Sequence, residues 1–73
     1  METRSVLHPA GVTILEVHGA VVADKDINLL RNVIHEIVER GERNLLIDLH
    51  ETHRMNSSGI GVLVGAHTTY GNA

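Results

Sequence analysis

The chain contains no cysteine, phenylalanine or tryptophan, and its 73 residues include one tyrosine and one proline. Without cysteine, neither a disulfide nor a thiolate-bound metal can stabilise the fold. Without large aromatic side chains, the core has to be built from isoleucine, leucine, valine and alanine. A chain of this length buries only about 60% of the surface that its unfolded form exposes. We therefore expect one small domain, residues 1–73, with a thin aliphatic core.

Charge and hydropathy argue against two classes of partner. The net charge is −3, and basic residues such as Arg40 and Arg43 do not gather into a patch, so nucleic-acid binding is not expected. No apolar run approaches the roughly 20 residues that span a bilayer, and residues 1–4 lack the apolar core of a signal peptide. The sequence thus predicts a cytoplasmic protein without a membrane span.

The N-terminal residues predict a β-hairpin. Residues 5–7 and 12–17 have strand character, and the turn between them contains Pro9, which fixes φ, and Gly11, which permits a positive φ. Alternation along the second strand predicts that Thr13, Leu15 and Val17 share one face. This strand is expected to end at residues 18–19, before an apolar bridge at residues 20–23.

A helix is predicted for residues 24–40. Its apolar residues recur at intervals of three and four, with Asp24 as the expected N-cap and Gly41 as a left-handed residue that ends the helix. The apolar positions are Ile27, Leu30, Ile34, Ile37 and Val38.

The nearly continuous apolar run at residues 44–49 predicts a strand covered on both faces. A right-handed crossover through the helix would make it parallel to residues 12–17. A polar loop is expected at residues 50–55. For residues 60–66, the glycines and valines favour a strand or loop, whereas the preceding Asn56-Ser57-Ser58 is a good helix-capping sequence.

The junction between Asp48 and Gly61 is the candidate site. A strand that ends in an acid, followed by hydroxyl residues and glycines, predicts a helix N-terminus at the carboxyl end of a strand. Unpaired N–H groups and the positive end of the helix dipole favour a carboxylate or phosphate at such a place.

These residues carry a family resemblance. The junction contains two short motifs, Asp48-Leu49 and then Met-Asn-Ser-Ser-Gly-Ile-Gly at residues 55–61. Together they resemble the signature of the STAS domain of bacterial anti-sigma factor antagonists. That signature is Asp-Leu-Ser and then Asp-Ser-Ser/Thr-Gly-Leu-Gly. The spacing of Asp48 and Asn56 fits it, and the order of elements covers nearly the whole chain. The resemblance implies an α/β fold with an N-terminal β-hairpin, then β-α-β-α, a mixed sheet with helices on one side, and a helix at residues 60–66.

The resemblance also implies a non-enzymatic switch. In this family the unmodified protein binds an anti-sigma factor that is itself a serine kinase, the kinase phosphorylates the serine after the motif's acid, and a phosphatase resets it. Here that serine is Ser57, with Asp48, Asn56 and Ser58 as supporting or partner-binding residues, together with Gly59 and Gly61. A phosphate at a helix N-terminus should leave the fold intact and abolish binding by charge repulsion and desolvation.

The sequence departs from the family pattern at several places. Asn56 replaces the usual acid, residues 20–22 are Ala-Val-Val where many antagonists carry an acidic pattern, and Arg54 stands where an apolar residue is common. The sequence also ends after the second expected helix, whereas the family continues into a further strand and helix. Either the sequence is a shortened piece, or another chain replaces the missing strand. If the 73 residues are the whole protein, we expect the unpaired sheet edge to promote self-association.

Simpler interpretations remain open at each position. Ser57 and Ser58 also fit an unregulated helix cap, Asp48 fits an acid that satisfies loop amides, and Gly59 and Gly61 fit close helix packing. A scaffold or assembly STAS module, as in stress-signalling, lipid-transport or transporter-associated complexes, is the alternative function. A nucleotide or small-ligand binder is a third.

Metal, enzyme and cofactor sites are not expected. His50, His53 and His67 do not have a zinc-site spacing, and Ser57 lacks both the Gly-x-Ser-x-Gly context and a placed base. No glycine-rich nucleotide-binding pattern is present.

Overall fold

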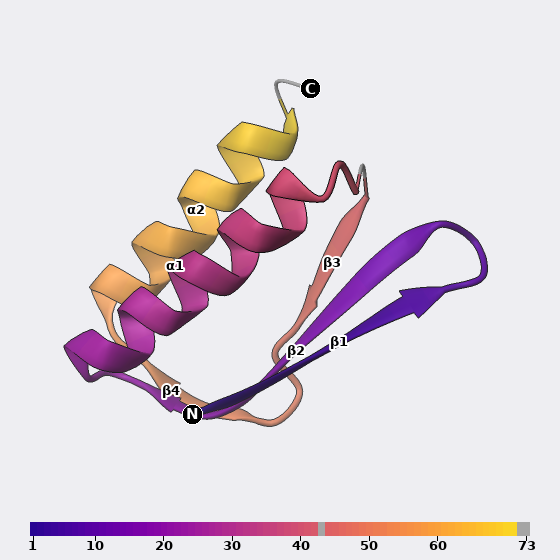
Figure 1. Ribbon diagram of the computed structural model, residues 1–73. Coiled ribbons are helices and arrows are strands. Elements are labelled where there is room, and N and C mark those ends of the chain that lie inside the picture. The colour runs from indigo at the N-terminus through magenta and orange to yellow at the C-terminus, as the bar shows by residue number, and fades with distance from the viewer. Residues whose placement is uncertain (43, 72–73) are drawn as a thin grey trace.

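The computed structural model describes residues 1–42 and 44–71, with side-chain surroundings up to residue 67. Four strands and two helices follow one another along these residues (Figure 1). They are β1 (Glu2–His8), β2 (Val12–Val21), α1 (Asp24–Glu39), β3 (Leu45–Asp48), β4 (Thr52–Met55) and α2 (Ser57–Gly71).

The strand β2 is the centre of the sheet, because all three other strands pair with it. The antiparallel partner is β1, which confirms the predicted hairpin, and Gly11 in its turn has a φ of +82°. β3 runs parallel to the first half of β2, and β4 runs parallel to its last residues. The register shifts between Gly19 and Ala20, and Gly19 has a φ of +95°. This irregularity lets one strand pair first with β3 and then with β4.

Three expectations about the strands are wrong. The strand β2 does not end at residues 18–19, because the Gly19 irregularity bends it and pairing with β4 carries it to Val21. Residues 50–55 are not all loop, because β4 occupies Thr52–Met55. The strand β3 is not covered on both faces: Leu46 is 55% exposed, since both helices lie on the other face of the sheet.

The two helices lie side by side on one face of the sheet (Figure 1), as the family resemblance implies. Alternation along β2 turns Thr13, Leu15 and Val17 toward them, and all three side chains are buried, which confirms the predicted face. The core between helices and sheet is aliphatic. It comprises Leu15, Val17, Val21, Ile27, Leu30, Ile34, Ile37, Val62 and Ala66.

The ends of α1 are fixed in different ways. The residue at its N-cap is Ala23, which makes no side-chain capping bond, so the prediction that Asp24 caps the helix is wrong. Asp24 and Asp26 instead lie in the first turn, where negative charge favours the helix dipole. At the other end, Gly41 has a φ of +77° and its N–H donates to the carbonyl of Val38 (3.0 Å), as expected of a glycine that ends a helix.

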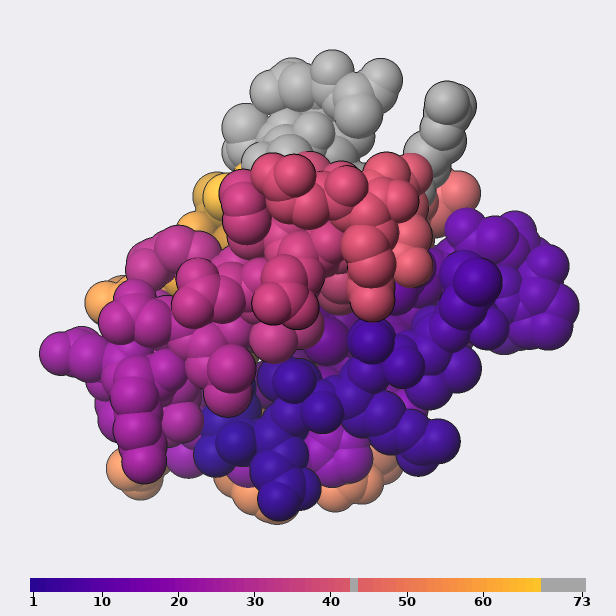
Figure 2. All heavy atoms as spheres, viewed as in Figure 1, coloured from indigo at the N-terminus to yellow at the C-terminus, as the bar shows by residue number. Residues whose placement is uncertain are grey.

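Side chains of α1 and of the hairpin close the space between the ribbons into a continuous surface in the space-filling view (Figure 2). Neither helix, over its described residues, has the length and apolar character needed to cross a bilayer.

Candidate functional site

A single residue, Asn56, connects β4 to α2. The helix begins at Ser57, which confirms the prediction of a helix at residues 60–66 despite its glycines and valines. The main-chain N–H of Asn56 donates to the carbonyl of Val21, the last residue of β2 (3.2 Å). The site therefore lies at the carboxyl ends of β2 and β4, where the strands stop and unpaired backbone groups collect.

The side chain of Asn56 makes two further bonds. Its Oδ1 accepts the N–H of Gly59 (3.0 Å), which satisfies one of the free donors of the first helical turn. Its Nδ2 donates to the carbonyl of Val22 (3.1 Å), just beyond β2. An aspartate here would accept from Gly59 but would have no donor for Val22. The asparagine that departs from the family pattern thus both caps α2 and ties it to the central strand.

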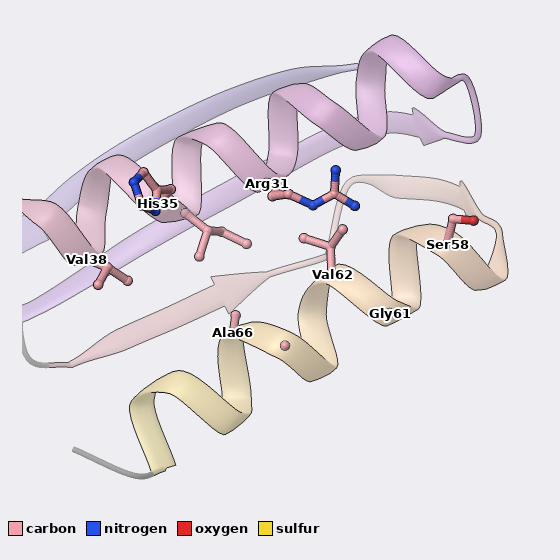
Figure 3. Close-up of a pocket in the computed structure, with 9 residues that line it drawn as sticks. Arg31, His35, Val38, Ser58, Gly61, Val62 and Ala66 are labelled. Atoms are coloured by element: carbon pink, nitrogen blue, oxygen red, sulfur yellow. The ribbon is translucent and has the colours of Figure 1, made fainter.

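Ser57 and Ser58 are both exposed, but they point in different directions. Successive residues of a helix are about 100° apart around its axis. Ser58 borders a groove between the helices together with Arg31 of α1 (Figure 3), and Ser57 is not among the residues that line it. Ser57 shares the outer face of α2 with Ile60 and Val64, which lie three and seven positions further on. Those side chains are 52% and 59% exposed.

The two glycines of the motif have separate environments. Gly59 is buried, and a Cβ built there would come within 2.7 Å of Met55 Cγ and 3.2 Å of Val21 Cγ1. Gly59 therefore lets α2 pack closely against β2 and β4. Gly61 is exposed, and a Cβ built there meets nothing within 4 Å. Helix packing explains Gly59, whereas Gly61 is free to serve another purpose.

The carboxylate of Asp48 makes its hydrogen bond in the turn after β3 and not at the start of α2. Its Oδ1 accepts the N–H of His50 (2.9 Å) in the turn after β3, which is the loop-amide role considered from the sequence. Asp48 is also the register partner of Glu16, on the sheet face opposite the buried Leu15 and Val17. The structure thus brings together Asn56, the two serines and the two glycines, and it places Asp48 apart from them.

The loop histidines do not form a site. The Nε2 of His50 lies 3.6 Å from Glu51 Oε1, both on the surface, and His53 is exposed on β4. Within residues 1–42 and 44–71, no three histidine, aspartate or glutamate side chains come together to hold a metal. His67 lies beside β3 in a small hollow that Leu45, Ile47 and Leu63 also line.

Two features of the site escape sequence analysis. The first is the bond from Thr52 Oγ1 to the carbonyl of Val17 (2.8 Å), which joins residues 35 positions apart and fixes the start of β4. The second is the groove between the helices, whose wall contains Arg31. A sequence signal for this groove exists in the small residues Ser58, Gly61 and Gly65, which recur at intervals of three and four along α2.

Comparison with known proteins agrees with this geometry. The family model of the STAS domain matches residues 4–73, so the chain belongs to the STAS family. A solved structure of the anti-sigma factor antagonist SpoIIAA in its unphosphorylated form has the same fold, with a TM-score of 0.78 and 14% sequence identity. The match covers 97% of this chain and 64% of the SpoIIAA chain. A search of curated protein sequences gives no significant match.

The glycine environments predict opposite effects of alanine. Gly61→Ala should raise the free energy of unfolding by up to about 1 kcal/mol, because alanine is the better helix former and meets no neighbour. Gly59→Ala should lower it, because the new methyl displaces Met55 and Val21. Urea unfolding followed by circular dichroism measures both. Equal stabilisation by the two substitutions would show that Gly59 does not mediate close packing.

Proposed function

We propose that this protein is a non-enzymatic regulatory STAS module that binds a partner protein when unmodified and releases it when Ser57 is phosphorylated. The observation that carries the proposal is an exposed hydroxyl at the first residue of α2, beside a helix start that Asn56 fixes to β2. By analogy with anti-sigma factor antagonists, the partner is an anti-sigma factor with serine-kinase activity, a phosphatase removes the phosphate, and the setting is the cytoplasm.

The electrostatics of the site suit such a switch. A phosphoserine carries about −1.5 to −2 charges at pH 7. At the N-terminus of α2 these charges meet the positive end of the helix dipole, and no acidic residue lies in the first turn. The folded chain is therefore expected to tolerate the phosphate. A partner surface that fits a neutral hydroxyl would instead meet a hydrated anion, and binding would weaken.

The outer face of α2 supports partner binding at the same place. Ile60 and Val64 form an exposed aliphatic pair on the side of the helix that begins with Ser57. Burial of these aliphatic side chains under a partner would stabilise a complex. A partner that covers Ile60 and Val64 would bring its own surface against Ser57, so a modification there would act directly on the interface.

A constitutive scaffold is the second candidate, and Asn56 favours it. The family signature has an acid immediately before the modified serine, whereas Asn56 is neutral and its side chain is hydrogen-bonded to Gly59 and Val22. If the kinase reaction requires that acid, the same surface would bind its partner without being modified.

Phosphorylation is the direct test of the first candidate. Incubation with a cognate anti-sigma kinase and ATP should add one phosphate, which mass spectrometry locates on Ser57 and which Ser57→Ala abolishes. The matched control is Ser58→Ala, which should still be labelled on Ser57. Ser57→Asp should weaken partner binding about tenfold or more with an unchanged circular dichroism spectrum. An intact complex with no label on Ser57 would contradict the switch and support the scaffold.

We further propose that the outer edge of β3 pairs with a second copy of this chain. Within the described residues no strand covers that edge, and Leu46 and Leu49 beside it are 55% and 40% exposed. If the β3 strands of two copies paired antiparallel around Leu46, apolar residues of the two strands would lie opposite each other on both faces of the joined sheet. Sedimentation velocity should show a dimer fraction that rises with concentration and falls in Leu46→Lys. A monomer at every concentration would contradict this pairing.

A further inference from the structure

A groove with both apolar and charged walls lies between α1 and α2. Its volume is about 530 Å³. Arg31 and Val38 extend into it from α1, and Val62 and Ala66 face them from α2 (Figure 3). Val62 and Ala66 belong to the buried core, so the floor of the groove is apolar.

Glycines keep the groove open on the side of α2. A Cβ built at Gly61 or at Gly65 meets nothing within 4 Å. Each of these positions costs about 1 kcal/mol of helix stability relative to alanine, and helix packing does not require either residue to be glycine. The space that the glycines leave is wide enough for a side chain or a backbone segment of another molecule to approach α2 closely.

The charge of the groove is opposite in sign to that of the chain. None of the described lining residues is acidic, and the cation on its α1 wall is Arg31, whereas the net charge of the chain is −3. His35, on the same wall, has its Nε2 3.2 Å from the carboxylate of Glu39. The described contact of the Arg31 guanidinium is one bond from Nη1 to Asn28 Oδ1 (2.9 Å), which is an uncharged acceptor. A guanidinium has five donors in a planar fork that matches a carboxylate. Arg31 is therefore available for a negatively charged group.

From these observations we infer that the groove binds an acidic segment of a partner protein. An apolar side chain of that segment would occupy the floor over Val62 and Ala66, and a carboxylate next to it would pair with Arg31. Ser58, in the first turn of α2, lines the same groove. Phosphate alone would not use the apolar floor, so a peptide segment fits the lining better than a small anion.

This inference deepens the proposed function and rests on it where it assigns the groove to the partner that Ser57 regulates. Ser57 lies on the outer face of α2 and directly precedes Ser58, which lines the groove, so a phosphate on Ser57 would add negative charge beside the groove. That charge would repel an acidic segment bound in the groove. Phosphorylation would weaken binding of an acidic partner without any change of the fold.

The test uses the 73-residue chain and two short blocked peptides, one of leucine and glutamate and the other with glutamine in place of every glutamate. In nuclear magnetic resonance titrations, the acidic peptide should shift the amides of Gly61 and Gly65 and bind about threefold more tightly than the neutral one. Arg31→Gln should remove this preference, and Ser57→Asp should reduce it. The matched control Lys25→Gln, an exposed cation elsewhere on α1, should keep it.

A second variant tests the apolar part of the groove. Gly61→Leu fills the open space beside Val62, so it should abolish binding of both peptides while the helix content of α2 is retained. Three results would each overturn the inference. They are equal binding of the two peptides, loss of the preference in Lys25→Gln as well as in Arg31→Gln, and unchanged binding to Gly61→Leu. The peptide titrations are independent of kinase labelling. Peptide binding in the groove without a label on Ser57 would contradict only the proposed phosphorylation switch. A label on Ser57 without peptide binding would contradict only the proposed groove.

Discussion

The structure depends on the polar side chain of Asn56. Three hydrogen bonds of this residue join the end of β2 to the start of α2: its N–H to Val21, its Nδ2 to Val22 and its Oδ1 from the N–H of Gly59. The helix that it starts is a poor helix by propensity, because glycine and valine recur along it. A helix of that kind forms where tertiary contacts hold it, and this cap together with the packing of Gly59 supplies them at its first turn.

The attachment of α2 through Asn56 separates the side chains of Ser57 and Ser58. Because the first turn of α2 is fixed against β2, Ser57 lies on the outer face near Ile60, and Ser58 lies at the groove that Arg31 borders. The outer face offers a hydroxyl beside exposed aliphatic side chains, whereas the groove offers a cation above an apolar floor. Ser57 and the groove thus lie on neighbouring surfaces of one helix. A negative charge added at Ser57 would change the electrostatic potential in the groove.

The sequence predicts the features that depend on periodicity or on a local motif. The alternation in β2 correctly assigns its buried face, and the apolar repeat correctly predicts the helix α1, which ends at Glu39, two residues before Gly41. Prediction from the sequence fails where a residue distant along the chain determines the local structure. The strand β4 has a short polar sequence, and only its pairing with residues 19–21 and the bond from Thr52 to Val17 make it a strand. The motif correctly predicts the helix start at Ser57, but the second bond of Asn56 and the nearness of Arg31 require the folded chain.

The most direct measurement is amide hydrogen exchange in Asn56→Ala, with Asn56→Asp as the matched control. The account predicts that Asn56→Ala lowers the free energy of unfolding by about 1 to 2 kcal/mol and speeds exchange of the Gly59 and Ile60 amides, whereas Asn56→Asp keeps Gly59 protected and loses only the bond to Val22. Unchanged exchange at Gly59 in Asn56→Ala would show that α2 starts without this residue, and the account would then be wrong.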